Sequence, residues 1–296
     1  MQRTYVSIII PTYNDWERLA LCVAALAVQS YPRDSFEVII VNNKPDDNIP
    51  EGFTLPDHFR IVAEEKPGSY AARNKGLCIA SGDIVGFTDS DCIPEPDWIK
   101  NAVLHFETNK NCSRIAGKID FYFKEVKPNH VEQLESLFSF NQDKYVERQG
   151  MGVTANMFSR KSVFNTVGNF NEKLMSGGDL EWGRRANAAG CSIHYVATVI
   201  VKHPARSTFA ELKSKARRVA GGHSQIGVYK KSTFLILAWK LILAFKPNLK
   251  ETIFIYRQKK LGVKSKTIIW AMRYNLQVTR ALEKFKVKRG KPPARF

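Results

Sequence analysis

Two aspartates one residue apart, Asp89 and Asp91, directly follow the apolar segment Ile84–Thr88. Their carboxylates can turn toward one cation, and such hard oxygen ligands suit Mg²⁺ or Mn²⁺, with diphosphate oxygens completing the coordination shell. A solvated acidic turn has the same short pattern. The metal interpretation therefore depends on the elements and polar residues around the pair.

A further carboxylate, Asp179, follows two glycines in the segment Gly177-Gly178-Asp179-Leu180-Glu181-Trp182. At the start of an expected helix, Asp179 could act as a general base toward an acceptor hydroxyl. It could equally be the N-cap of that helix. Glu181 in the same first turn could serve the helix dipole.

His203 lies after the expected strand Tyr195–Val201 and before a proline. A neutral imidazole is a good ligand for Mn²⁺, although a single histidine is more often structural. Arginines can hold a phosphate in a bidentate manner or remain surface charges. The arginines considered for this role are Arg73, Arg184 and Arg185.

The first hundred residues alternate short apolar segments with helix-forming segments. This rhythm predicts a parallel sheet with helices on both faces, where ligands bind beyond the carboxyl ends of the strands. The expected strands are Val6–Ile10, Glu37–Val41, Arg60–Ala63 and Ile84–Thr88, with helices at 15–30 and 69–80. The polar residues at 11–14, 42–43 and 89–91 all follow strands, so they should converge in one crevice.

The middle of the chain is predicted to be mixed. We expect helices from Asp97, over Val131–Phe140 and over Leu180–Ala189, strands over Ile115–Phe123 and Tyr195–Val201, and a basic helix over Ser207–Gly221. A compact stretch that contains glycines is expected to lead to Ser176-Gly177-Gly178-Asp179.

Length and composition describe a folded protein, because 296 residues of which 44% are hydrophobic can bury a full core. The longest apolar run, Phe234–Phe245, is interrupted by Lys240 and is too short to span a bilayer. No signal peptide is expected. Five cysteines without a C-x-x-C pair suit a reducing cytoplasm.

Positive charge is concentrated in the last third of the chain. Residues 202–296 contain 24 Lys and Arg but 3 Asp and Glu, whereas residues 1–201 carry a small acidic excess. This asymmetry indicates an anionic partner. Because the front part has no basic excess, we do not expect nucleic acid.

We expect the basic helices to lie on an anionic membrane surface at the inner face of the membrane, with Trp239 and Trp270 as interfacial aromatics. Alternatively, their apolar residues pack on the catalytic domain.

Seven segments match one enzyme family in order and separation: 6–14 (VSIIIPTYN), 37–43 (EVIIVNN), 68–76 (GSYAARNKG), 87–92 (FTDSDC), 154–157 (TANM), 178–181 (GDLE) and 201–204 (VKHP). Over residues 5–206 the chain resembles the family 2 glycosyltransferases. The resemblance implies the GT-A fold, an α/β, Rossmann-like, mixed and mainly parallel sheet flanked by helices. It implies a catalytic domain at 1–206, and the charge pattern predicts a basic helical, membrane-associating region at 207–296.

The resemblance also implies residue roles on the donor side. Pro11 and Tyr13 begin the nucleotide pocket, with Tyr13 near the base, and Arg73 reaches the donor. Asn43 stands where the family often has an aspartate that hydrogen-bonds uracil; an amide can still donate and accept. Asn156 would line the sugar or acceptor pocket.

On the catalytic side, the resemblance makes Asp89 and Asp91 the metal-binding pair, His203 a further metal ligand and Asp179 the base. The cofactor would be Mn²⁺ or Mg²⁺. The metal would neutralise charge on the departing nucleoside diphosphate, and a single displacement would invert the anomeric configuration.

The expected function is transfer of a sugar from a nucleotide-diphosphate sugar, UDP-linked by expectation, to a hydroxyl of a glycan or lipid-linked acceptor in a cell-surface polysaccharide or glycoconjugate pathway. One alternative is a catalytically silent, membrane-associated scaffold of the same fold. Another is a nucleotidyltransferase, which would require a glycine-rich basic loop at Pro11–Asn14.

Overall fold

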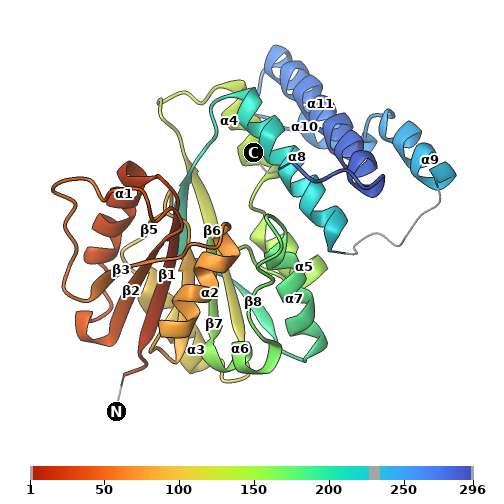
Figure 1. Ribbon diagram of the computed structural model, residues 1–296. Coiled ribbons are helices and arrows are strands. Elements are labelled where there is room, and N and C mark those ends of the chain that lie inside the picture. Colours follow the sequence, from red (N-terminus) through yellow and green to blue (C-terminus); the bar gives the residue numbers. More distant parts are fainter. Residues whose placement is uncertain (1–2, 227–233, 295–296) are drawn as a thin grey trace. The chain divides into compact units, whose positions relative to one another are not determined.

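A computed structural model describes residues 3–226 and 234–294 (Figure 1). The chain forms two compact units. Unit 1 contains residues 1–122, 140–173 and 178–204, and unit 2 contains residues 123–139, 174–177 and 205–296. The expected division at 206/207 treated each domain as uninterrupted. The structure instead assigns two earlier segments to unit 2.

Unit 1 is built on one sheet of eight strands in the order β3-β2-β1-β4-β7-β6-β8-β5. The pairs β1–β2, β1–β4, β2–β3 and β6–β8 are parallel, whereas β7 is antiparallel to β4 and β6, and β5 is antiparallel to β8. The strands are β1 (Val6–Thr12), β2 (Phe36–Asn42), β3 (Phe59–Ala63), β4 (Ile84–Thr88), β5 (Ile93–Pro94), β6 (Arg114–Tyr122), β7 (Asn156–Arg160) and β8 (Ile193–Pro204). This is the mixed, mainly parallel sheet expected from the sequence.

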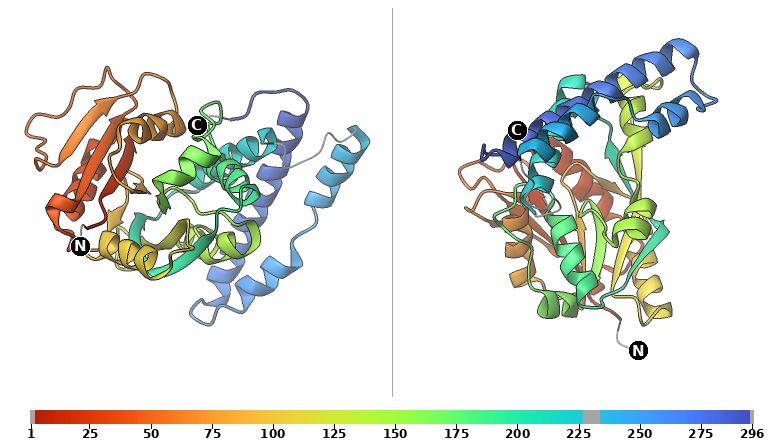
Figure 2. Two further views of the ribbon diagram at one scale, coloured as in Figure 1. Left: turned by 90° about the horizontal axis from the view of Figure 1, so that it is seen from below. Right: turned by 90° about the vertical axis from the view of Figure 1, so that its right-hand side faces the viewer.

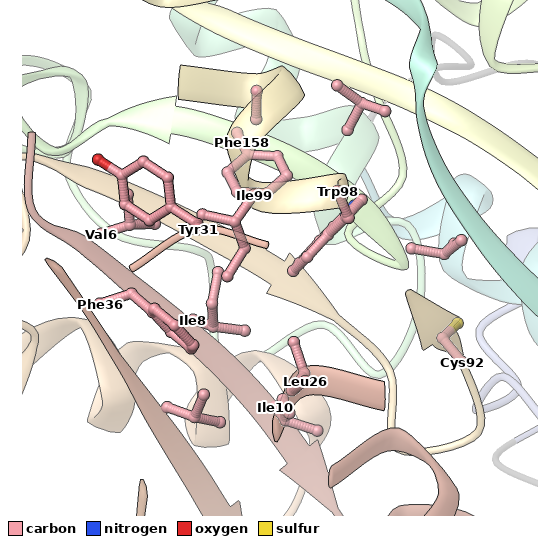
Figure 3. Close-up of a cluster of buried hydrophobic side chains, with 14 of the residues drawn as sticks. Val6, Ile8, Ile10, Leu26, Tyr31, Phe36, Cys92, Trp98, Ile99 and Phe158 are labelled. Atoms are coloured by element: carbon pink, nitrogen blue, oxygen red, sulfur yellow. The ribbon is translucent and has the colours of Figure 1, made fainter. Parts of the chain in front are cut away.

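Helices flank the sheet in unit 1 (Figure 1). They are α1 (Trp16–Ala27), α2 (Ser69–Ile79), α3 (Trp98–Thr108), α5 (Gln142–Gln149), α6 (Lys161–Val167) and α7 (Gly178–Ala188), with a 3₁₀ turn at Arg33–Ser35. Every residue of β1, β2 and β4 is buried, which explains their continuous apolar runs. Ile8, Ile10, Leu26, Trp98 and Phe158 belong to the main core cluster (Figure 3).

The position of α2 depends on a small residue. A Cβ atom at Gly76 would lie 2.5 Å from Cγ2 of Ile9 on β1, so only glycine permits this close approach of helix and strand. The tight contact fixes how closely α2 approaches β1.

Unit 2 is helical. Its helices are α4 (His130–Phe138), α8 (Phe209–Gln225), α9 (Phe234–Ala244), α10 (Leu249–Tyr256) and α11 (Val263–Lys288), and α8 lies beside α11 (Figures 1 and 2). Leu134 of α4, Leu212 of α8 and Ile269 and Leu276 of α11 share one core cluster. This shared core explains why the segment that carries α4 belongs to unit 2.

A buried carboxylate also connects α4 to residues after 204. Glu135 is 1% exposed and accepts hydrogen bonds from the Arg206 backbone amide and guanidinium, each at 2.7 Å, and from Lys215 at 2.8 Å. Removing one partner from such a buried ionic group is costly, so these bonds tie the start of α8 firmly to α4.

None of the helices in the described residues is both long and apolar enough to cross a membrane.

Candidate active site

The candidate residues gather at the carboxyl ends of β4 and β8. Asp89 and Asp91 follow β4, and His203 is the penultimate residue of β8. Because β7 is antiparallel to β4 and β6, and β6 is parallel to β8, strands β4 and β8 point the same way. Because β1 is parallel to both β2 and β4, the residues that follow these strands, at 11–14, 42–43 and 89–91, lie at one edge of the sheet as expected, and β8 brings His203 to the same edge.

His203 presents one ring nitrogen to Asp91. Its Nε2 atom lies 3.6 Å from Asp91 Oδ2, and its Nδ1 atom lies 2.7 Å from the carbonyl oxygen of Pro204. Since a carbonyl only accepts, Nδ1 carries a hydrogen, which leaves Nε2 as the ring nitrogen whose lone pair a cation could use. A second hydrogen bond that fixes the tautomer in this way is typical of metal-ligating histidines.

Arg73 of α2 pairs with Asp89. Its Nη2 atom is 2.5 Å from Asp89 Oδ1, and the arginine is 3% exposed. Desolvation raises the pKa of Asp89, whereas the Arg73 guanidinium and His203 oppose this rise and Asp91 adds to it. Arg73 therefore holds a carboxylate in place, a role that the resemblance did not suggest.

Arg18 of α1 was not selected from the sequence, yet it lies beside the site. Its Nη1 atom is 3.6 Å from Asp91 Oδ2, and its Nε atom donates to Asp15 at 2.8 Å. Ser90 also donates to Asp15, at 3.1 Å. The three-residue spacing of Asp15 and Arg18 was the feature of the sequence that could have predicted their ion pair.

The donor set fits a hard divalent cation. Ligand atoms of Asp91, Cys92 and His203 all lie within 4.8 Å of one another. Burial raises the pKa of the Cys92 thiol well above its usual range, and sulfur is a soft ligand that Mg²⁺ and Mn²⁺ do not prefer. The carboxylates of Asp89 and Asp91 and the His203 imidazole remain, which is a set that Mn²⁺ or Mg²⁺ accepts.

The carboxylate of Asp179 is oriented by a tyrosine. The Tyr70 hydroxyl donates to Asp179 Oδ1 in a short hydrogen bond, and the backbone amide of Thr154 donates to Oδ2 at 3.3 Å. Asp179 is the second residue of α7, so it is not the N-cap of that helix. The hydrogen bonds instead fix a carboxylate that can accept a proton.

Gly178 makes the contact with Tyr70 possible. A Cβ atom at this position would lie 2.6 Å from Cζ of the Tyr70 ring, which no neighbouring movement could easily relieve. The preceding Gly177 has a φ of +82°, a value that L side chains rarely adopt. Glycine is thus favoured at position 178 because a Cβ atom would collide with Tyr70, and at position 177 because of its backbone conformation.

Helix α2 orients both the Asp89 carboxylate and the Asp179 carboxylate. Tyr70 and Arg73 are three residues apart on α2, which places them on the same face. The Arg73 guanidinium lies 5.6 Å from the Tyr70 ring centroid. Sequence reasoning selected Arg73 but not Tyr70, although both lie in the segment 68–76.

Replacing Tyr70 by phenylalanine should lower kcat by roughly 10- to 100-fold, because a hydrogen bond to a charged group and the orientation of the carboxylate are lost together. Burial and the charge of Asp179 raise the pKa of Tyr70, so its hydroxyl remains a donor throughout the working range. In the variant, the acidic limb of the kcat/KM profile should move to higher pH. An unchanged profile would show that Tyr70 only packs.

Asn43 has its amide engaged within the protein. Nδ2 donates to the carbonyls of Glu64 at 2.8 Å and Lys66 at 2.7 Å, and Oδ1 accepts from Gly68 N at 2.7 Å. Both amide hydrogens are used, so direct donation to a nucleotide base is not available in this arrangement. Asn43 shapes the loop that leads into α2.

Changing Asn43 to aspartate should not restore a base contact but should lower the free energy of unfolding by about 1–3 kcal/mol. The new carboxylate would face two carbonyl oxygens and leave a buried group unsatisfied. Chemical denaturation measures the loss, and nucleotide titration tests the base contact. Tighter UDP binding with unchanged stability would contradict this interpretation.

Asn156 is also structural in this arrangement. It is fully buried, its Oδ1 accepts from Trp98 Nε1 at 2.9 Å, and its Nδ2 donates to the carbonyls of Lys118 at 2.7 Å and Val199 at 3.0 Å. A Cβ at Gly117 would collide with it at 2.4 Å. We therefore correct the expectation that this side chain lines the sugar pocket.

The other residues selected from the sequence differ in exposure and in their partners. Tyr13 directly follows β1 and is 58% exposed, and Pro11 is buried within β1. Arg185 pairs with Glu181 at 2.8 Å and donates to the carbonyl of Asn169 at 2.7 Å, so both charges fasten α7 rather than bind phosphate. Arg184 is exposed.

Known proteins share both the sequence pattern and the fold. A family model described as "Glycosyl transferase family 2" matches residues 7–168. The glycosyltransferase AglE of Haloferax volcanii is 34% identical over 250 residues, which is 80% of each chain. The glucosyl-dolichyl phosphate glucuronosyltransferase of the same organism is 25% identical over 184 residues, 59% of this chain and 58% of that protein.

Two solved structures share the fold at low identity. The mannosyltransferase PcManGT from Pyrobaculum calidifontis, in complex with GDP-Man and Mn²⁺, has a TM-score of 0.55 at 16% identity and covers 96% of this chain and 74% of its own. TarS 1–349 from S. aureus, in complex with UDP, has a TM-score of 0.53 at 16% identity and covers 97% of this chain and 92% of its own.

The sheet, its flanking helices and these neighbours define a GT-A fold. The chain belongs to glycosyl transferase family 2, and it is a glycosyltransferase.

Proposed function

We propose that this chain is a metal-dependent, inverting glycosyltransferase that uses a nucleoside-diphosphate sugar and acts on a hydroxyl of a lipid-linked or glycan acceptor. The observation that carries the proposal is the grouping of Asp89, Asp91 and His203 at one edge of the sheet, with Asp179 held by the same helix that holds Asp89. A scaffold protein without catalytic activity would not need the Asp179 carboxylate to be held in a fixed orientation by Tyr70.

In the proposed reaction, Asp179 accepts the proton of the acceptor hydroxyl while the oxygen attacks the anomeric carbon. The bond from that carbon to the diphosphate breaks on the opposite face, so the configuration inverts. Asp89, Asp91 and His203 would hold Mn²⁺ or Mg²⁺, which supplies positive charge for the departing diphosphate. Arg18, 3.6 Å from Asp91, is placed to interact with the same anionic group.

We propose a UDP-sugar donor, with Tyr13 packing near the base and Pro11 and Asn43 shaping the pocket through the backbone. One structural neighbour binds UDP and another GDP-Man, so both nucleotides belong in the test. A panel of UDP-, GDP- and dTDP-sugars should be assayed for release of free nucleoside diphosphate. Release from UDP-sugars with Mn²⁺ present is expected, and no release from any donor would reject the proposed activity.

The exposed apolar side chains of α9 and α10 support a membrane-associated acceptor. Ile236, Trp239 and Ile242 on α9 are 47%, 61% and 58% exposed, and Leu249 and Ile253 on α10 are 70% and 44% exposed. Exposed lysines and arginines accompany them at 246, 250, 257, 259, 260 and 264. Apolar residues flanked by basic ones suit the interface of an anionic membrane.

Trp270 must be removed from the expected interfacial residues. Its Nε1 atom donates to Thr252 Oγ1 at 3.0 Å, and its ring stacks on Tyr274 and packs against the core of unit 2. Trp270 therefore packs within unit 2, which differs both from the expected membrane contact and from the alternative of packing on the catalytic domain. Trp239 is exposed.

The protein should co-sediment with vesicles that contain phosphatidylglycerol, and less so at high salt because screening weakens the attraction. Trp239→Glu should reduce vesicle partitioning by roughly 10-fold or more, since the indole is lost and a negative charge is added. Leu104→Glu on α3 is a matched control, because Leu104 is 53% exposed in unit 1. Absence of sedimentation at low salt would reject membrane association.

A further inference from the structure

A second group of metal-ligating side chains lies away from the active site. Ligand atoms of His105, Cys112 and His194 all lie within 4.8 Å of one another, and His105 Nε2 is 3.0 Å from His194 Nδ1. The residues come from the last turn of α3, the loop before β6 and the second residue of β8. Because His203 is near the other end of β8, the two groups occupy opposite ends of one strand.

The backbone that carries these ligands is held by hydrogen bonds. Arg160 of β7 donates from Nε to the Cys112 carbonyl and from Nη2 to the Phe106 carbonyl, each at 2.9 Å. On the other side, the Ser113 amide donates to Ser192 Oγ at 3.0 Å. The loop between α3 and β6 is therefore fixed to both neighbours without any ligand, and the three side chains meet at little conformational cost.

The burial and the ligand types of this group distinguish it from a chance cluster of exposed side chains. Cys112 is fully buried, and its thiol donates to the Arg114 carbonyl at 3.2 Å. Both histidines are partly buried and have aligned ring nitrogens, one of which must present a lone pair to the other. Two imidazoles and one thiol suit a borderline-soft cation far better than they suit Mg²⁺ or Mn²⁺.

We propose that His105, Cys112 and His194 bind one Zn²⁺ ion that is separate from the catalytic metal. On binding, the Cys112 S–H bond breaks, its proton passes to solvent, and the thiolate sulfur becomes a ligand. With Zn–N near 2.0 Å and Zn–S near 2.3 Å, ligand atoms should be roughly 3.3–3.7 Å apart in a tetrahedral site. The imidazoles therefore separate slightly, and water takes the fourth position.

Cobalt replaces zinc in such sites and makes a thiolate ligand visible as a charge-transfer band in the near ultraviolet. Metal-free protein should be titrated with Co²⁺ in excess Mg²⁺, which occupies oxygen-rich sites without competing for sulfur and imidazole. The wild-type protein should develop the band with about one equivalent of Co²⁺, and Zn²⁺ should displace it. Cys112→Ser should lose the band and bind Zn²⁺ roughly 100-fold more weakly or worse.

Cys191→Ser is the matched control, because Cys191 lies near His194 in sequence but outside the ligand group. It should keep the band. As a second readout, Zn²⁺ should raise the melting temperature of the wild-type protein and of Cys191→Ser but not that of folded Cys112→Ser or His194→Ala. A wild-type protein without the band, or an unchanged band in Cys112→Ser, would show that the histidines form only a hydrogen-bonded pair.

Discussion

Asp91→Asn is expected to reduce turnover by about 100-fold or more with either Mn²⁺ or Mg²⁺ while leaving the thermal melt nearly unchanged. The amide cannot supply the charge that a hard cation requires, and stabilisation of the departing diphosphate is a dominant catalytic contribution. Stability should persist because the Asp91 carboxylate is partly exposed and its ion pairs, to Arg18 and His203, are both 3.6 Å long. Steady-state kinetics with a metal titration measures the effect.

Asp120→Asn is the matched control for this variant. Asp120 lies on β6 and pairs with Lys118 at 2.8 Å through side chains that are both about two-fifths exposed. Such an exposed pair contributes little, so this variant should keep its metal response. Full activity of the wild-type protein in EDTA would overturn the proposed metal requirement.

Asp179→Asn is expected to lower kcat by roughly 10²-fold or more while donor affinity remains near that of the wild type. Asparagine keeps the size of the side chain and can still accept the hydrogen bond from Tyr70, but it cannot take up a proton. Single-turnover assays with acceptor, together with donor titration, separate the chemical step from binding.

The comparison of Asp179→Asn with Tyr70→Phe adds a second criterion. If Asp179 is the base, removing it should cost much more than removing the tyrosine that orients it. If Asp179 only fastens the start of α7 to Thr154, both variants should instead lower the melting temperature and retain kcat. That outcome would assign the proton transfer to another group.

The elements that carry the site could be predicted because their residues show a local pattern. Continuous apolar runs marked β1, β2 and β4, which are buried on both faces, and polar residues after each run marked the binding edge. In contrast, β7 was not predicted. Its sequence, Asn156–Arg160, contains three polar residues that find their partners across the sheet and in distant loops.

Side-chain roles were harder to predict than their locations. Asn43 and Asn156 are at the expected edge, but their amides bind backbone carbonyls that come from segments far away in sequence. Tyr70 and Arg18 were missed for the same reason, because their importance arises from carboxylates that folding brings to them. Residue type indicates what a group can do, whereas its tertiary partners determine what it does.

The spacing of Tyr70 and Arg73 on α2 has a consequence for protein engineering. Any substitution that rotates or lifts this helix, including one at Gly76 where it touches Ile9, shifts the supports of Asp179 and Asp89 at once. Libraries intended to change sugar or acceptor preference should therefore leave residues 68–76 untouched. Substitutions at the exposed Tyr13 would leave both carboxylates in place but would change the proposed contact with the base.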